Sequence, residues 1–308
     1  MDREIRKAAV LIEALPYIQR FRGESVVVKL GGSAMEDPAH LESVLTDVAF
    51  MECVQMRVVV VHGGGKAISR AMERRGIAPR FLHGLRVTCE ETMQVVREVI
   101  EEEVNPKIVG LLREKGAQAE PLRGQTVFRV ERKTGTDPET GETLDWGYVG
   151  EATSVSTDPV RERTAKGVIP VITPLGTGSD GHVHNMNADT AAAAIAKALR
   201  ARKLVYLSDV PGLLEDPKDP ASVLTTLPVD KVEDLVERGV IRGGMLPKVG
   251  SGIEALKAGV RKVHMIDGRM QHSLLLEIFT DRGVGTEIVG SPQARRGPGA
   301  EGRVRERE

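Results

Sequence analysis

The sequence predicts an α/β protein with an open, mainly parallel, twisted sheet and helices on both faces. Short runs rich in β-branched residues recur along the chain without apolar–polar alternation, which is typical of strands buried on both sides. Segments with helical spacing follow most of these runs, as in a parallel sheet. Glycine clusters end two of the runs, at the edge where open α/β sheets bind ligands.

The first element is an amphipathic helix over residues 1–22, appended to the main domain. Apolar residues recur at three- and four-residue spacing from Ile5 to Leu15, with charged residues between them, and Gly23 breaks the pattern. A helix outside the core must bury its apolar stripe somewhere. The pattern allows burial on a partner subunit or on the helix's own domain.

The remaining elements form one main domain over residues 23–290. Strands are expected at 25–30, 57–61, 168–172, 203–207 and 261–266, and helices at 38–55, 66–75, 90–115 and 190–200. The polar, glycine-containing region 126–151 favours edge β-hairpins. Residues 291–308, rich in Arg, Gly and Glu, are expected to be a disordered tail.

Composition excludes several classes of function. The 43 Lys and Arg nearly balance the 44 Asp and Glu, so the net charge of -1 gives no general attraction to nucleic acid or anionic membranes. Aromatic residues make up only 3%, too few for base-stacking platforms. No apolar run approaches the ~18 residues of a membrane span. We therefore expect no nucleic-acid or membrane partner.

The cysteines and the N-terminus indicate a cytoplasmic protein. Cys53 and Cys89 lie far apart and in no CxxC arrangement, which argues against a disulfide framework or a cysteine zinc site. The first residues carry charges throughout and are not expected to be a secretory signal.

Glycine is over-represented, with 33 residues in 308 against an average of ~7%. Gly31-Gly32 and Gly63–Gly65 follow predicted strands where helices begin, so backbone N–H groups and a helix N-terminus can face an anion there. Further clusters occur at 176–181 and 243–252. One such turn could be free of ligand, but two together favour a phosphate site.

The common nucleotide-binding patterns are not convincing. GxxxxGK[ST] is absent, whereas GxGxxG occurs at 176–181. The residues after it alternate like a hairpin strand instead of opening a helix, so we interpret the match as accidental. His182 and His184 share a face of that strand, and without a third ligand they are expected to be surface residues. The sequence thus predicts no metal site.

Several motifs occur in a family-specific order. They are Lys29–Gly32 (KLGG), His62–Gly65 (HGGG), Gly84–Thr88 (GLRVT), Asn185–Asp189 (NMNAD), Leu207–Gly212 (LSDVPG) and Gly243–Lys248 (GGMLPK). Together, over residues 25–290, they resemble the N-acetylglutamate kinases of the amino-acid kinase superfamily. KLGG and GGMLPK belong to the superfamily, whereas GLRVT and NMNAD point to the N-acetylglutamate enzymes. The stretch 123–145 matches no part of that pattern.

The resemblance implies transfer of the ATP γ-phosphoryl group to the side-chain carboxylate of N-acetyl-L-glutamate, an early step of arginine biosynthesis, with Mg²⁺ on the phosphates. A carboxylate is ionised at neutral pH and needs no general base. The chemistry needs charge neutralisation, because two anions must meet. By resemblance, Lys29 and Lys248 stabilise the transferring group, Asp189 lies between them, and the N–H groups of Gly32 and Gly64 contact phosphoryl oxygens.

The resemblance also assigns binding residues to two lobes. In an N-lobe at about 23–185, Arg86 holds the α-carboxylate and Asn185 the acetamido group, beside Gly64 and Gly65. A C-lobe at about 186–290 holds the nucleotide. Its expected nucleotide contacts are Asp209, Val210, Gly212, Leu213, Leu214, Gly243 and Lys248.

The ends of the domain resemble the arginine-inhibited members of the family. In those, the N-terminal helix links dimers into a hexamer, a trimer of dimers, and arginine binds beside it. Expected arginine contacts are Tyr17, His272, Glu277 and Gly283. Alternatively, the apolar residues 274–279 only pack a last helix. The resemblance leaves open whether a signalling protein docks on the enzyme.

Two other functions compete with this one. The chain could phosphorylate a related carboxylate, such as an aminoadipate derivative in lysine synthesis. It could also be a non-catalytic regulator that binds arginine or nucleotide. Retention of Lys29, Asp189 and Lys248 argues against a regulator, because a sensor needs no pair of phosphoryl-binding lysines.

Overall fold

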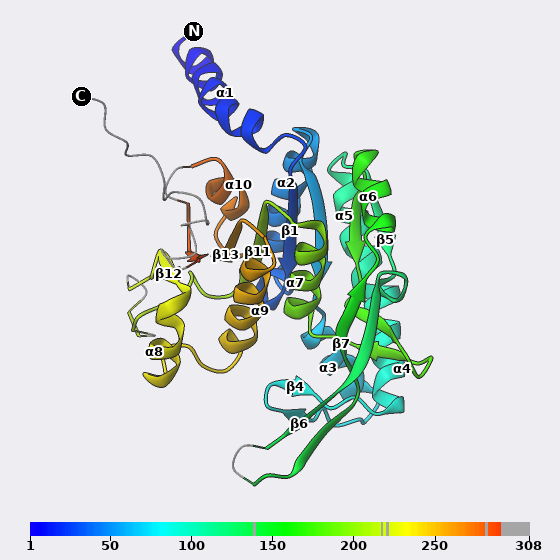
Figure 1. The fold of residues 1–308 in the computed structure, drawn as a ribbon. Coiled ribbons are helices and arrows are strands. Elements are labelled where there is room, and N and C mark those ends of the chain that lie inside the picture. Colours follow the sequence, from blue (N-terminus) through cyan, green and yellow to red (C-terminus); the bar gives the residue numbers. More distant parts are fainter. Residues whose placement is uncertain (138–139, 217, 220–221, 281–282, 291–308) are drawn as a thin grey trace, which may run out of the picture.

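The computed structural model describes residues 1–137, 140–216, 218–219, 222–280 and 283–290 (Figure 1). The predicted disordered tail, 291–308, lies outside the described residues. The central sheet has eight strands in the order β12-β14-β13-β11-β1-β2-β8-β5. Its strands are β1 Ser25–Leu30, β2 Arg57–His62, β5 Ala119–Leu122, β8 Ile169–Ile172, β11 Lys203–Ser208, β12 Thr226–Pro228, β13 Lys262–Asp267 and β14 Thr286–Val289.

The sheet is mainly parallel, as predicted. From β13 to β5 every neighbouring pair is parallel, whereas β14 pairs antiparallel with β13 and carries β12 at the edge. All five predicted strands are present. The sequence analysis missed β5, β12 and β14, which are short, and Pro121 and Pro228 interrupt the strand pattern of the first two.

Helices cover both faces of the sheet. Those on one face are α2 Pro38–Cys53, α5 Asn105–Glu114 and α10 Ser273–Ile278, and those on the other are α6 Asp158–Ala165, α7 Ala188–Leu199, α8 Val232–Glu237 and α9 Met245–Lys257. The side chains of β1 alternate between the two faces of the sheet. Val26 and Val28 pack towards α2, whereas Val27 packs towards α7. Lys29 therefore points to the α7 side, at the carboxyl end of β1.

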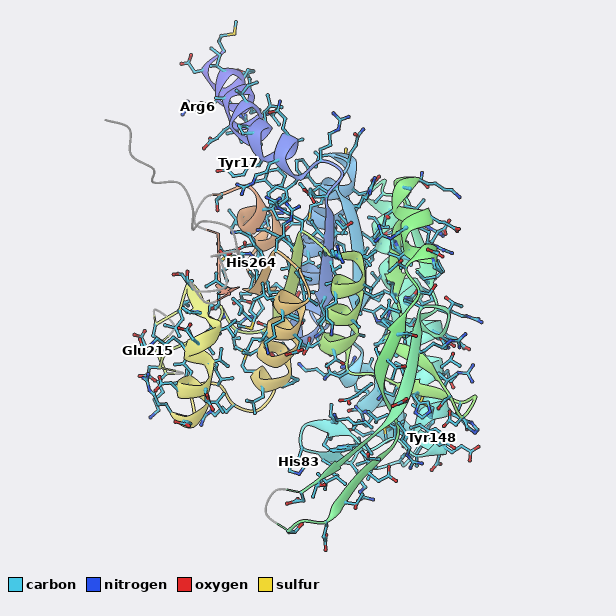
Figure 2. All side chains as sticks on the ribbon, in the orientation of Figure 1. Arg6, Tyr17, His83, Tyr148, Glu215 and His264 are labelled. Atoms are coloured by element: carbon cyan, nitrogen blue, oxygen red, sulfur yellow. The ribbon has the colours of Figure 1, made fainter. Side chains whose placement is uncertain are left out.

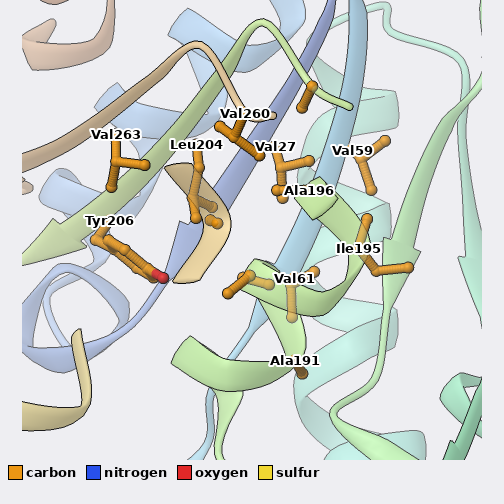
Figure 3. Packing of buried hydrophobic residues seen from close by; sticks show 14 of the residues in the cluster. Val27, Val59, Val61, Ala191, Ile195, Ala196, Leu204, Tyr206, Val260 and Val263 are labelled. Atoms are coloured by element: carbon orange, nitrogen blue, oxygen red, sulfur yellow. The ribbon is translucent and has the colours of Figure 1, made fainter. Parts of the chain in front are cut away.

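Helix α7 lies close against the strands, as Figure 3 shows. Ala191 and Ala196 are fully buried in the same cluster as Val27, Val59 and Val61. Alanine side chains keep the helix close to the sheet, and interiors packed at this density leave little room for extra atoms.

The predicted helix at 90–115 is present but not uniform. It consists of α4 Glu90–Glu98, a π-helical segment at Val99–Val104 (the π segment) and α5. Pro106 has no backbone N–H and cannot make the hydrogen bond to the carbonyl one α-helical turn before it. This missing bond fits a wider turn just before Pro106. The π segment and α4 pack with α3 Gly65–Arg74 in a separate cluster beside the sheet.

The polar region 126–151 forms the predicted hairpin, from β6 Phe128–Thr136 and β7 Thr143–Val155. With β9 Leu175–Gly178 and β10 Val183–Asn185 it closes into a four-stranded ring. The GxGxxG match runs from β9 into the turn before β10 and opens no helix, so the hairpin interpretation is confirmed.

One prediction in this region is wrong. His182 is exposed, but His184 is buried with 1% exposure, and its Nε2 lies 3.0 Å from an oxygen of Asp180. The ring is closed, so its inward face is covered, and His184 packs there beside Gly150 and Gly178.

Helix α1, Asp2–Phe21, projects from the body of the molecule (Figure 1). Phe21 at its end is buried, but Ile5, Leu11 and Ile12 are 59–67% exposed, so the described domain does not cover the predicted stripe. Of the helices in the described part of the chain, none has the length and apolar content of a membrane span.

The close packing of α7 gives a stability prediction. We expect Ala196→Leu to lower the free energy of unfolding by ~1–3 kcal/mol, because the larger side chain does not fit against the strands. Chemical denaturation measures this. Ala198→Leu, at a partly exposed position of the same helix, should stay within ~0.5 kcal/mol of the parent chain. Equal losses in both variants would contradict close packing of this face.

Candidate active site

The carboxyl ends of β1 and β2 bring the two strand-end glycine clusters together. The parallel register pairs Leu30 with His62, so Gly31-Gly32 and Gly63–Gly65 leave the sheet side by side. Two cavities of about 690 and 200 Å³ open here, and both are lined by Lys29, Gly63–Gly65 and Arg86. This is the edge at which an open α/β sheet binds its ligand.

Asp189 joins the two predicted catalytic lysines. Lys29 Nζ lies 2.8 Å from Asp189 Oδ1, and Lys248 Nζ lies 2.8 Å from Oδ2. The side chains of Lys29 and Asp189 are 8% and 6% exposed, and that of Lys248 is 17% exposed. The structure therefore brings all three residues together, from β1, α7 and α9.

The charges around Asp189 keep it ionised. Burial opposes ionisation, but the ammonium groups of Lys29 and Lys248 outweigh burial and hold the pKa of Asp189 below its usual range. One carboxylate between two ammonium groups leaves a positive charge in excess, which suits a site for an anion.

Two residues, Asn187 and Tyr206, hold the Asp189 backbone in place. Asn187 is the N-cap of α7, and its Oδ1 accepts from the N–H groups of Asp189 and Thr190. The Tyr206 hydroxyl, on β11, contacts the Asp189 carbonyl at 3.4 Å and Ser251 Oγ of α9 at 2.8 Å. The sequence analysis assigned no role to Asn187, although Asn before an alanine-rich helix is a common cap signal.

Gly31 contributes to the site in a way that the sequence analysis missed. The Lys29 side chain folds back over it, so a Cβ at position 31 would lie 2.1 Å from Lys29 Nζ. Any side chain at 31 therefore has to displace the ammonium group from Asp189. The sequence shows a glycine at position 31, but only the conformation of the Lys29 side chain explains why a glycine is needed there.

The two glycines predicted to contact phosphoryl oxygens, Gly32 and Gly64, also occupy positions where the structure restricts a side chain. Gly32 has a φ of +62° and lies beside the carboxylate of Asp209. A Cβ on Gly64 would lie 2.5 Å from Ile100 Cδ1, on the π segment. Gly65 has open space around it.

Arg86 is buried at 7% exposure and lines both cavities. Its guanidinium donates to Gly65 O at 2.9 Å and Ser69 Oγ at 2.8 Å, and it lies 4.7 Å from the centre of the Phe81 ring. It is therefore fixed in place, not a solvated hairpin arginine. Asn185 lines the smaller cavity, so the structure brings the two predicted substrate residues to one space.

The predicted nucleotide loop, 209–214, is anchored to β14. The Leu213 N–H donates to Thr286 Oγ1 at 2.8 Å, and a Cβ on Gly212 would lie 2.6 Å from the same oxygen. Gly212 is thus required by packing against Thr286, whereas the sequence predicts it only as a nucleotide contact. Leu213 is buried in the core at 1% exposure, and Leu214 bridges to Val223. Val210 O accepts from Ser208 Oγ.

The predicted nucleotide residues do not share one cavity. Gly243 lines a cavity of about 930 Å³ between α7, α9 and the β6–β7 hairpin. Asp209 instead lies at the other glycine cluster, beside Gly32. Lys248 faces Asp189 between these regions.

The predicted arginine residues only partly come together. Tyr17, Glu277 and Gly283 line a cavity of about 250 Å³ between the end of α1 and α10. His272 lies elsewhere, because α10 begins against α2 and its Nδ1 contacts Asp47 Oδ1 at 2.6 Å. Figure 2 shows Tyr17 at the inner end of α1 and His264 near β13.

The same cavity contains two buried residues that the sequence analysis missed. Lys203 Nζ and His264 Nδ1 lie 2.9 and 2.7 Å from Glu277 Oε1. Burial opposes ionisation of Glu277, but His264 and Lys203 lower its pKa to about 2. The alternative, that residues 274–279 pack a last helix, is also true in part, since Leu274 and Ile278 are core residues.

Comparisons with known proteins agree with this architecture. The model of the amino acid kinase family matches residues 24–267. The acetylglutamate kinase of Heliobacterium modesticaldum is 46% identical over 294 residues, covering 94% of this chain and 100% of that protein. That of Carboxydothermus hydrogenoformans is 47% identical over 293 residues, with the same shares covered.

Solved structures show the same fold. N-acetylglutamate synthase from Neisseria gonorrhoeae, complexed with coenzyme A and N-acetyl-glutamate, matches at a TM-score of 0.78 and 26% identity. Its complex with coenzyme A and L-arginine matches at 0.75 and 25%. Both cover 91% of this chain but only 63% and 65% of the synthase chain. Together with the family match and the curated relatives, they show that this chain belongs to the amino acid kinase family, among the acetylglutamate kinases.

Proposed function

We propose that the chain transfers the γ-phosphoryl group of ATP to the side-chain carboxylate of N-acetyl-L-glutamate, a step of arginine biosynthesis, using Lys29, Asp189 and Lys248. The observation that carries the proposal is the pair of ammonium groups bridged by one buried carboxylate, beside two strand-end glycine clusters. It occurs in a chain 46–47% identical to proteins named acetylglutamate kinase.

The reaction requires the site to neutralise charge. The attacking carboxylate and the phosphates of ATP are all anionic, and the transferring group carries its charge on three equatorial oxygens. Lys29 and Lys248 supply fixed positive charge from two sides, and Asp189 keeps both from drifting to solvent. Backbone N–H groups of Gly32 and Gly64 add donors that need no reorganisation. No residue has to remove a proton.

The acyl substrate fits the smaller cavity. Arg86 and Asn185 both line it, so a guanidinium and an amide can recognise a carboxylate and an acetamido group. Gly64 and Gly65 line the same space. The similar synthase was solved in complex with N-acetyl-glutamate, a ligand of this class.

ATP is proposed to lie over the C-lobe, between the loop 209–214 and Gly243, with its phosphates towards Lys248. Within the described residues no group of three or more His, Cys, Asp or Glu could hold a metal ion. Both oxygens of Asp189 already face lysines. Mg²⁺ would then arrive as an ion carried on ATP, held by phosphate oxygens and water.

A substrate panel tests the function. Purified chain with ATP and Mg²⁺ should form acyl phosphate, trapped as a hydroxamate, with N-acetylglutamate in preference to glutamate, aspartate or aminoadipate derivatives. Lys248→Ala should fold normally and lose about 10²–10³-fold in kcat. Preference for an aminoadipate derivative would overturn the substrate. Arginine or nucleotide binding without turnover of any carboxylate would indicate a regulator.

The position of Gly31 gives a second prediction. The backbone there is not left-handed, so Gly31→Ala is conformationally allowed, but the new Cβ must displace Lys29 from Asp189. We expect kcat to fall by about 10²-fold, the usual cost of one preorganised donor, with little change in Tm. Gly110→Ala in α5, where a Cβ meets nothing within 4 Å, is the matched control. Equal kcat in both variants would contradict the role of Gly31.

We further propose that arginine inhibits the enzyme by binding between α1 and α10. Tyr17, Glu277 and Gly283 line that cavity, and a carboxylate there can pair with a guanidinium. The similar synthase was also solved in complex with L-arginine. The uncovered apolar stripe of α1 supports its proposed role in linking dimers into a hexamer. Cytoplasmic location stays a prediction from the cysteine pattern.

The stripe can be tested by a matched pair of substitutions. Ile12→Glu places a charge on the stripe, whereas Arg6→Glu adds the same residue on the polar face, where Arg6 is exposed. By light scattering, Ile12→Glu should yield a smaller oligomer with weaker arginine inhibition, and Arg6→Glu should keep the parent mass. Deleting residues 1–22 should act like Ile12→Glu. An unchanged mass after deletion would rule out α1 as the linker.

A further inference from the structure

The backbone carbonyls of the Gly63–Gly65 loop are all bound by the protein. Gly63 O lies 2.8 Å from His62 Nδ1, Gly64 O accepts from the Ile68 N–H at 2.9 Å, and Gly65 O accepts from Arg86 at 2.9 Å. The Gly63 N–H donates to Leu30 O. Within the described residues, no acceptor is found for the N–H groups of Gly64 and Gly65.

This distribution gives the loop its polarity. A carbonyl turned towards a phosphoryl group would repel it, whereas an N–H group attracts it. Carbonyls that are held back and N–H groups that are left free make the loop a donor surface. The bond to Gly64 O comes from the α3 backbone at Ile68, and the bond to Gly65 O comes from Arg86, a proposed substrate residue. The bond from His62 to Gly63 O has no such explanation.

The proton of His62 can be located by following fixed acceptors. Asn105 has one side-chain nitrogen, Nδ2, which lies 2.9 Å from Val171 O and 3.0 Å from His62 Nε2. A carbonyl can only accept, so the atom facing Val171 O must be the amide nitrogen. Since that nitrogen donates, His62 Nε2 must accept, and the ring proton is on Nδ1, where it donates to Gly63 O.

The surroundings of His62 keep its ring uncharged and in one tautomer. His62 and Asn105 are both buried, and burial lowers the pKa of His62 to about 4, so the ring is uncharged at neutral pH. The Asn105 oxygen has no hydrogen-bond partner among the described residues, so nothing favours the flipped amide.

The π segment places Asn105 where it can reach His62. The Asn105 N–H bonds to Ile100 O, five residues back, so these two residues lie on one face of the wide turn. Ile100 packs under Gly64, and Asn105 binds His62. One helical turn thus supports the loop at two points.

We propose that His62 and Asn105 are positioning residues for phosphoryl transfer, which turn the Gly63 carbonyl away from the transferring group and leave the Gly64 N–H facing it. Asn105 fixes the His62 tautomer, and His62 fixes the Gly63 peptide. The inference rests on the proposed role of the Gly64 N–H in the reaction.

Two substitutions of His62 distinguish this role from simple packing. The amide nitrogen of Asn occupies the place of Nδ1, so His62→Asn can still donate to Gly63 O. The amide of Gln reaches the place of Nε2, so His62→Gln cannot, although Gln is closer to His in size. We expect His62→Asn to stay within about 5-fold of the parent kcat, and His62→Gln and His62→Leu to lose about 10–100-fold, because small misplacements of a reacting group are costly.

The split between kinetic constants is the second readout. If the loop acts on the transferring group, kcat should fall while KM for N-acetylglutamate changes little. Gln matching or exceeding Asn in kcat, as size alone would rank them, would overturn the proposal. The ranking can be measured with any carboxylate that the parent chain phosphorylates, so a wrong substrate assignment and a wrong role for His62 give different results.

A measurement on the parent chain needs no variant to fold. Nitrogen-15 NMR of labelled histidine should show His62 neutral with its proton on Nδ1, unchanged from pH 6 to 8. The assignment comes from the signal lost in His62→Asn or, if that variant does not fold, from the coupling of the ring proton to the Gly63 carbonyl. A neutral ring protonated on Nε2 would overturn the proposal.

Discussion

The site depends on one carboxylate that holds two like charges near each other. Lys29 and Lys248 are carried by β1 and α9, and their ammonium groups would repel each other without Asp189 between them. A buried carboxylate in turn needs such partners, and removing Asp189 would leave two buried ammonium groups uncompensated. The charges of the site can therefore balance only if β1, α7 and α9 pack in this arrangement. The N-cap of α7 and the Tyr206 hydroxyl both serve it.

Much of the fold could be predicted from the sequence because the strands buried on both sides are long apolar runs. β1, β2 and β11 stand out against their polar neighbours, and glycines mark the ends of β1 and β2. Short elements carry less signal, so β5 and β12 were missed. The π segment was missed for a different reason. An amphipathic pattern shows that a helix is present, but it does not resolve one wide turn within it.

The parts of the site whose chemistry depends on residue type could be predicted from the sequence. The parts that depend on side-chain conformation could not. Lys29, Asp189 and Lys248 were found through motifs, and the structure joins them. The place of Gly31 under the Lys29 side chain and the bond between His62 and Asn105 depend on contacts that no spacing rule contains. His184 and His272 were misplaced because ring closure and the α2–α10 contact, which bury one and redirect the other, are properties of the whole fold.

The wide turn before Pro106 also limits how this chain can change in length. One residue added to or removed from an α-helix rotates everything beyond it by about 100°. Within residues 99–104 such a change would turn Asn105 away from β2 or Ile100 away from the glycine loop, although neither residue belongs to the Lys29–Asp189–Lys248 cluster. Loops elsewhere on the surface can absorb insertions and deletions. The segment 99–104 must keep its residue count if Ile100 and Asn105 are to keep their contacts, so the chain is constrained there in length as well as in sequence.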